Sequence, residues 1–127
     1  MKIAALICRI LLGLVFTIFG ANGLHPFLPM PPMPAGLARD YVTILMQSHY
    51  VVIVAAVQFI SGLMLLANLY VPLALTLLGP VLVNILCYHF LMQPVGLPLA
   101  LIVTLLWFVL FFYYRRSFAG IFERKPI

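Results

Sequence analysis

Residues 50–114 read YVVIVAAVQFISGLMLLANLYVPLALTLLGPVLVNILCYHFLMQPVGLPLALIVTLLWFVLFFYY and contain no Asp, Glu, Lys or Arg. Two short proline-containing turns, at residues 68–72 and 93–96, interrupt this apolar stretch. They divide it into runs at residues 50–67, 69–92 and 95–114. Each run can cross about 30 Å of hydrocarbon at about 1.5 Å per residue. Because backbone groups in lipid must pair within their own segment, we expect three antiparallel transmembrane helices.

A fourth apolar run, residues 3–23, comes before this stretch. Arg9 interrupts it and no A-x-A-like cleavage site closes it, so we interpret it as a retained first helix and not as a signal peptide. The 127 residues are 66% hydrophobic and only 7% charged, whereas soluble domains are about 25% charged. So few charges cannot cover a surface that faces water. We therefore predict one all-α domain over residues 1–127, a membrane-embedded antiparallel four-helix bundle without a separate soluble catalytic domain.

The connection between the first and second runs is longer than the other two. Residues 26–34 hold five prolines in nine positions, which forbids a regular helix. Residues 36–48 follow with Arg39 and Asp40 beside regularly spaced apolar side chains. This spacing predicts a short amphipathic helix that lies in the membrane interface. A re-entrant loop packed against the bundle is the alternative for the proline segment.

Basic residues predict the orientation of the bundle. Lys2 flanks the first helix, and a cluster of Arg and Lys follows the fourth. An even number of spans puts both termini on one side, which we assign to the cytoplasm. The net charge is +5, but the sequence shows no basic face of the kind that binds nucleic acid. The basic tail at residues 115–127 instead indicates the topology and a contact with anionic lipid. We expect the short part of this tail after Arg116 to be polar and partly frayed.

Polar side chains gather at the opposite, outer end in this topology. All three histidines fall there: His25, His49 and His89. They are joined by Asn22, Tyr50, Asn84, Tyr88, Met92 and Gln93, with Met30 and Met33 in the loop above. Such a pocket could bind a quinone headgroup, a polar lipid or a soft metal. Alternatively, these residues lie at the interface because water and headgroups satisfy them there. No histidine pair has metal-ligand spacing, so we predict no metal site.

Arg9 is the one charged residue well inside an apolar run. A central intramembrane Arg costs about 2.5 kcal/mol or more to insert. Arg9 shares a helical stripe with Gly13, Phe16 and Gly20, which should face the interior because glycines allow helices to approach closely. Gln58, beside Ser61 and Gly62, is the nearest mid-membrane partner for Arg9; snorkelling to the cytoplasmic surface is the alternative.

Other patterns narrow the range of functions. The membrane-spanning runs contain no Asp or Glu, which argues against an ion-coupled transporter with an acidic proton relay. We find no phosphate loop, nucleophile elbow, metal-protease helix or haem-attachment motif. Trp107 and the Phe/Tyr run to Tyr114 predict an aromatic belt and lipid-facing packing.

The order of segments resembles the DoxX family of small bacterial membrane proteins. The resemblance rests on RILLGLVFTIFGANGL from Arg9, HPFLPMPPMP from His25, QFISGLMLL from Gln58 and LGPVLVNI from Leu78. It implies a four-helix inner-membrane protein. Named relatives are linked to thiosulfate:quinone oxidoreductase subunits and to a mycobacterial complex handling oxidative and thiol stress.

The resemblance also assigns individual residues. It implies that Arg9 corresponds to the family's Arg in helix one, Asn22 to its Asn near the end of helix one, and Asn84 to its Asn in helix three. Related sequences often carry Glu where this chain has Gln58, which replaces a potential ion pair by a neutral hydrogen bond.

These observations together predict a DoxX-like membrane subunit or ligand-binding module, for quinone or lipid, that supports a redox system. The predicted ligand-binding residues are Arg9, Asn22, His25, Gln58, Asn84, Tyr88 and His89. The bilayer and a redox partner protein are the expected partners, and quinone is the one cofactor the pattern suggests. A self-sufficient quinone-dependent oxidoreductase acting on thiosulfate or thiols is the alternative, and a small-solute transporter a weaker one. The residues leave open whether the chain is an enzyme.

Overall fold

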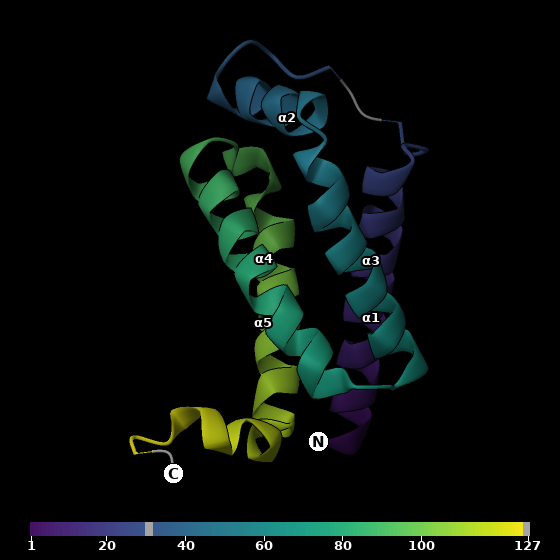
Figure 1. Cartoon of the computed structure of the whole chain (residues 1–127), viewed down its shortest axis with the longest axis vertical. Helices are drawn as coiled ribbons and strands as arrows, with labels where there is room; N and C mark the ends of the chain where they lie inside the picture. The colour runs from purple at the N-terminus through teal and green to yellow at the C-terminus, as the bar shows by residue number, and fades with distance from the viewer. Residues whose placement is uncertain (30–31, 126–127) are drawn as a thin grey trace.

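The computed structural model describes residues 1–29 and 32–125. Within them, four helices are long and apolar enough to cross a membrane. The elements in chain order are α1 (Lys2–Leu24), α2 (Leu37–Gln47), α3 (Tyr50–Ala67), α4 (Val71–Leu91), η1 (Pro94–Gly96), α5 (Leu97–Tyr113) and η2 (Arg115–Phe122). The protein is thus a multi-pass membrane protein, and the predicted all-α four-helix bundle is confirmed (Figure 1).

Two helices begin later than the sequence predicts, for local reasons. Before α4, Asn68 and Tyr70 have left-handed backbone conformations, with φ of 56° and 52°, so the chain turns until Val71. Pro72 then occupies the first turn, where its missing N–H leaves no bond unmade. Before α5, residues Pro94–Gly96 form a 3₁₀ turn.

The tightest packing in the bundle joins α1 to α3. A Cβ on Gly20 would lie 2.5 Å from the backbone nitrogen of Phe59, and one on Gly62 would lie 2.5 Å from that of Thr17. Only a hydrogen fits at such distances, so both glycines are needed for the two backbones to approach. Gly13, Phe16 and Gly20 are buried as predicted, which confirms that this stripe of α1 faces the interior.

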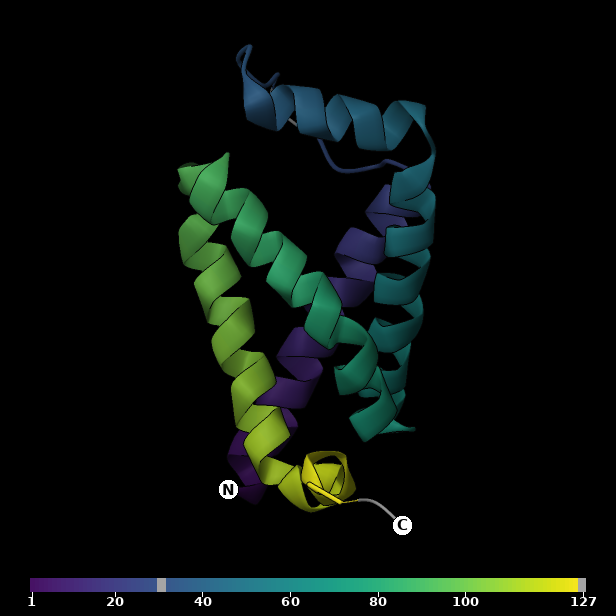
Figure 2. The same ribbon diagram turned by 60° about the vertical axis from the view of Figure 1, so that its left-hand side comes forward.

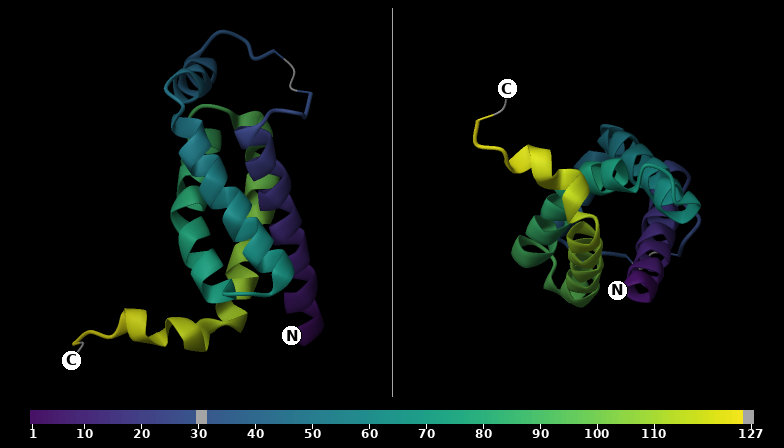
Figure 3. Two further views of the ribbon diagram at one scale, coloured as in Figure 1. Left: turned by 45° about the vertical axis from the view of Figure 1, so that its right-hand side comes forward. Right: turned by 90° about the horizontal axis from the view of Figure 1, so that it is seen from below.

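The remaining helices complete a ring in the order α1, α3, α4 and α5 (Figure 3, right). Its interior is filled by leucines that are fully buried: Leu12, Leu65, Leu75, Leu78 and Leu110. Large apolar side chains cover the outside of every span, as lipid requires.

The two ends of the bundle differ. Both termini lie at one end, called the terminal end below, as an even number of spans demands (Figure 1). The short helix α2 lies across the other, called the loop end (Figure 2). Its half-buried positions are Ala38, Tyr41, Val42 and Leu45, while Arg39 and Asp40 are exposed. The predicted amphipathic helix is therefore confirmed.

Two parts of the aromatic C-terminal region are packed more closely than the sequence predicts. The tail is helical over Arg115–Phe122, because η2 forms and buries Phe118 against Phe111, with ring centroids 4.8 Å apart, whereas residues 123–125 form no helix. Trp107 does not simply face lipid. It is half-buried, stacks on Phe111 and donates from Nε1 to the carbonyl oxygen of Leu75 at 2.9 Å. This bond ties α5 to α4, since an indole N–H in hydrocarbon needs an acceptor.

Candidate functional site

Most of the predicted loop-end residues lie where α1 and α4 end and α3 begins, but several of them bond the chain itself. Asn22 Oδ1 accepts hydrogen bonds from the backbone nitrogens of Phe27 and Leu28, both at 2.9 Å. Asn22 therefore fixes the chain as it leaves α1. His25 is the exposed residue that ends this helix. Met33 is half-buried in the loop, whereas Met30 lies outside the described residues.

His89 and Tyr88 hold the loop end together. His89 Nδ1 lies 3.0 Å from the carbonyl oxygen of Gln93, an atom that can only accept, so Nδ1 carries the proton. The His89 ring also fills the space where Gly96 would carry a Cβ. The Tyr88 ring lies 5.4 Å from that of Tyr41, which connects α4 to α2. Both side chains thus have positions explained by packing.

Asn84 and Gln58 are not brought together with the residues above. Asn84 is exposed on the outer face of α4, and its Nδ2 donates to the carbonyl oxygen of Pro80 at 2.9 Å. Gln58 is half-buried within α3. Within the described part of the chain, no three His, Cys, Asp or Glu side chains lie close enough together to hold a metal ion.

Arg9 bonds a helix end, and the expectation that Gln58 is its partner is wrong. Its Nη1 donates to the carbonyl oxygens of Leu65 and, at 3.3 Å, of Leu66. These are among the last four carbonyls of α3, which have no partner inside the helix and carry the negative end of its dipole. A guanidinium group suits that position because it supplies charge and several donors at once. Arg9 therefore needs no carboxylate within the bilayer.

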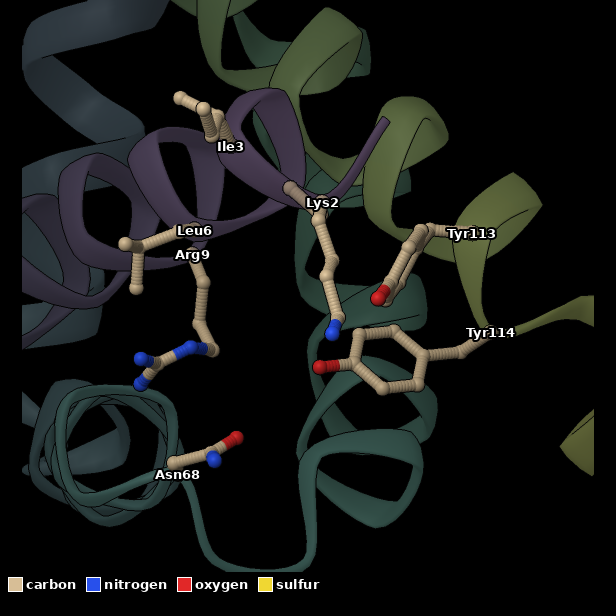
Figure 4. Close-up of a pocket in the computed structure, with 8 residues that line it drawn as sticks. Lys2, Ile3, Leu6, Arg9, Asn68, Tyr113 and Tyr114 are labelled. Carbon is tan, nitrogen blue, oxygen red and sulfur yellow. The ribbon is translucent and has the colours of Figure 1, made fainter.

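The Arg9 side chain also lines a pocket at the terminal end. The pocket holds about 380 Å³. Its walls come from α1, the α3–α4 turn and the end of α5: Lys2, Ile3, Ala5, Leu6, Arg9, Asn68, Tyr113 and Tyr114. Figure 4 shows the Lys2 ammonium group pointing toward the phenol groups of Tyr113 and Tyr114, and Arg9 pointing toward the end of α3 near Asn68. We call this the first pocket.

A second pocket of about 500 Å³ adjoins the first. Its lining residues are Met1, Phe112, Tyr113, Tyr114, Arg115, Arg116 and Ser117. Tyr113 and Tyr114 thus line both pockets. Arg115 donates from Nη1 to the carbonyl oxygen of Phe112 at 2.9 Å, and its guanidinium lies 4.6 Å from the centroid of that ring.

The electrostatic character of the two pockets is uniformly positive. Lys2 and Arg9 line the first, and Arg115 and Arg116 line the second, with no carboxylate from the part of the chain that the structure describes. The chain has only two acidic residues. Asp40 lies in α2 at the loop end, and Glu123 follows η2. Both pockets are therefore suited to an anion or to an acceptor-rich headgroup.

Sequence reasoning identified Arg9 in this site but missed the rest. The sequence pattern predicts topology signals at Lys2, Arg115 and Arg116 and an aromatic belt at Tyr113 and Tyr114. A usable signal exists, because Lys2 and Arg9 are two helical turns apart on one face of α1. With both termini predicted on one side, this face belongs to the same end as the basic cluster.

No family model, no curated protein and no solved structure matches this chain. The likeness to the DoxX family therefore stays an expectation raised by the sequence. The case for a function rests on the two pockets and on the residues that line them.

Proposed function

We propose that this membrane protein is a ligand-binding module that holds a membrane amphiphile, a quinone or a lipid, by its headgroup at the terminal end. In this role it serves as a non-catalytic subunit of a redox system. The observation that supports the proposal is the first pocket, where Lys2, Arg9 and two tyrosine hydroxyl groups line one cavity among helix ends. Helix ends lie at the headgroup level of a bilayer, so an amphiphile meets these donors at its own depth.

The pocket offers both halves of an amphiphile-binding site. The cationic and phenolic groups donate hydrogen bonds to carbonyl, hydroxyl or phosphate oxygens. Ile3 and Leu6 line the same pocket and are 74% and 46% exposed, so they extend an apolar surface from the pocket along α1. A headgroup can therefore lie among the donors while its hydrocarbon tail follows the helix.

The lining favours binding over chemistry. Among residues 1–29 and 32–125, no Cys, His, Asp or Glu lines either pocket. These are the side chains that most often carry thiol exchange or acid–base catalysis near neutral pH. Cys8 is half-buried in α1 and Cys87 is exposed on α4, and neither is among the lining residues. A partner enzyme would supply the redox reaction.

Native mass spectrometry of protein released from its own membrane tests the proposal. The wild type should retain one quinone or lipid, and a K2A/Y113F double variant should lose it. R39A, which removes an exposed charge from α2 at the loop end, is the matched control and should retain the ligand. Loss of ligand from R39A alone, or equal retention by all three proteins, would refute the assignment to the first pocket. Co-purification of an oxidoreductase with the wild type tests the subunit role.

A further inference from the structure

The two terminal-end pockets adjoin one another. Tyr113 and Tyr114 line both, so a ligand that fills one lies beside the other. Each pocket has two basic side chains among its lining residues: Lys2 and Arg9 in the first, Arg115 and Arg116 in the second. The terminal end therefore presents two neighbouring cationic cavities with a shared phenolic wall.

The charge in these cavities discriminates between ligands. A neutral quinone headgroup accepts hydrogen bonds but leaves the positive charges of each cavity unbalanced. A phosphodiester carries one negative charge and oxygen acceptors, which Lys binds as a point charge and Arg with its planar fork. At the edge of the bilayer, where the effective dielectric constant is below that of water, such pairing is stronger than in bulk solvent. The lining therefore favours an anionic phosphate over a quinone.

We infer that the two pockets together bind one lipid molecule with two phosphodiester groups. This inference rests on the proposed function and names its ligand class. Lys2 and Arg9 hold one phosphate, and Arg115 and Arg116 hold the other. The hydroxyl groups of Tyr113 and Tyr114 lie in the wall between the two phosphates and donate hydrogen bonds to the bridging part of the headgroup. Basic pockets between membrane helices are suited to lipids of this kind.

The apolar surroundings fit the same ligand. Ile3 and Leu6 line the first pocket on α1, and Phe112 lines the second on α5. All three side chains are exposed, and α1 lies against α5 in the ring (Figure 3). A lipid in which each of two phosphodiester groups joins the headgroup to an acylated unit carries acyl chains on both sides of that headgroup. One set can follow α1 while the other follows α5.

Lipid titration of the purified full chain in phosphatidylcholine nanodiscs tests the inference. The probes are cardiolipin, phosphatidylglycerol and ubiquinone, each added in small amounts and counted by native mass spectrometry in about 0.15 M salt, where the Debye length is about 8 Å. We expect one cardiolipin per chain, bound at least about fivefold more tightly than phosphatidylglycerol, since each additional basic contact to an anionic lipid gives roughly that factor.

Charge variants assign the two phosphates to the two pockets. K2Q in the first pocket and R116Q in the second should each weaken cardiolipin binding about fivefold, while phosphatidylglycerol, which can occupy the unchanged pocket, should bind about as well as it does to the wild type. R124Q and K125Q remove the same charge from the tail beyond both pockets and should change binding less than about twofold, because salt screens them.

The other outcomes overturn the inference in different ways. Equal binding of cardiolipin and phosphatidylglycerol to the wild type would overturn the two-phosphate ligand while leaving the proposed function intact. Retention of ubiquinone without cardiolipin would also overturn the two-phosphate ligand and leave the proposed function intact. Displacement of cardiolipin by millimolar inorganic phosphate would show a site for a soluble anion. An equal loss in R124Q and K2Q would show unspecific attraction to a basic tail. No retained amphiphile of any kind would overturn both proposals.

Discussion

The loop end and the terminal end both carry polar side chains at the edge of the same bundle, but they use them differently. At the loop end, Asn22 bonds two backbone nitrogens, His89 bonds the carbonyl oxygen of Gln93, and Tyr88 packs on Tyr41. At the terminal end, Lys2 and the tyrosines Tyr113 and Tyr114 line a cavity. A gathering of polar residues is therefore a weak guide to a site. Donors that face open volume are a better one.

Arg9 belongs to both kinds of residue. It bonds the end of α3 through Nη1, and it also lines the first pocket. Its guanidinium has five N–H donors, so two carbonyl contacts leave others to face a ligand. Arg9 is thus the residue whose loss should affect stability and binding together.

The largest expected effect is that of Arg9→Ala. It leaves the last carbonyls of α3 without a charged donor, so we expect a loss of about 2 kcal/mol in the free energy of unfolding, together with loss of the bound amphiphile. Heating in detergent followed by size-exclusion chromatography measures the first effect, and native mass spectrometry the second. Arg9→Lys keeps the charge but loses the planar guanidinium group. Its stability and its lipid retention should therefore lie between those of Arg9→Ala and those of the wild type. Full lipid retention in Arg9→Ala would mean that this residue is purely structural.

Gly96→Ala should give the next largest effect, and at the loop end alone. The added methyl group would lie 2.6 Å from Nδ1 of His89 and 2.9 Å from Oε1 of Gln93. Such overpacking costs about 1.5 kcal/mol, so the midpoint of thermal unfolding should fall while lipid retention stays unchanged. Gly120→Ala is the matched control, because no side chain or distant backbone atom of the described residues lies within 4 Å of the position of its Cβ. Equal stability of the two variants would contradict the close packing of His89.

Asn22→Ala tests whether a polar residue of the loop end affects only the local structure and not the lipid bound at the terminal end. The change removes the acceptor for the backbone nitrogens of Phe27 and Leu28 and should cost about 1 kcal/mol, since water satisfies part of what is lost at an exposed loop. The hydrogen exchange of these two amides should rise, as read by mass spectrometry of the intact chain. Asn22→Asp keeps the acceptor and should restore the protection. Loss of bound lipid in Asn22→Ala, with normal amide protection, would move the ligand site to the loop end.

The fold was accessible from the sequence because the bilayer imposes it. A run of apolar residues between two turns has one stable conformation in lipid, so the spans could be predicted to within a few residues. The structure differs from the prediction where the backbone conformation of one residue, or one side-chain contact, decides the local fold. Tyr70 adopts a left-handed backbone conformation that no hydropathy pattern indicates. The tail folds because the ring of Phe118 packs against that of Phe111.

The candidate site was harder to predict because its decisive contacts involve backbone atoms and tertiary neighbours. Every helix has carbonyls at its end that accept no hydrogen bond from within the helix, so the sequence does not distinguish the pair on Leu65 and Leu66 that accepts from Arg9. In the same way, the bond from Trp107 to the Leu75 carbonyl depends on how α5 lies against α4. The sequence does indicate which end is basic, and that end carries the two pockets.

The smallest expected effect, that of Tyr41→Ala, tests whether the loop end is a unit with no ligand of its own. The variant removes the ring that packs on Tyr88 and should cost about 0.5 kcal/mol, because an aromatic pair contributes little beyond the area it buries. The loss should be confined to α2, whose amides should exchange faster while those of α3 and α4 do not. Thr43→Ala changes an exposed position of the same helix and should leave exchange unaltered. If Tyr41→Ala instead reduced cardiolipin binding at the far end, the two ends would be coupled through α4. The loop end and the terminal end would then act together, and their polar side chains could not be assigned separate structural and ligand-binding roles.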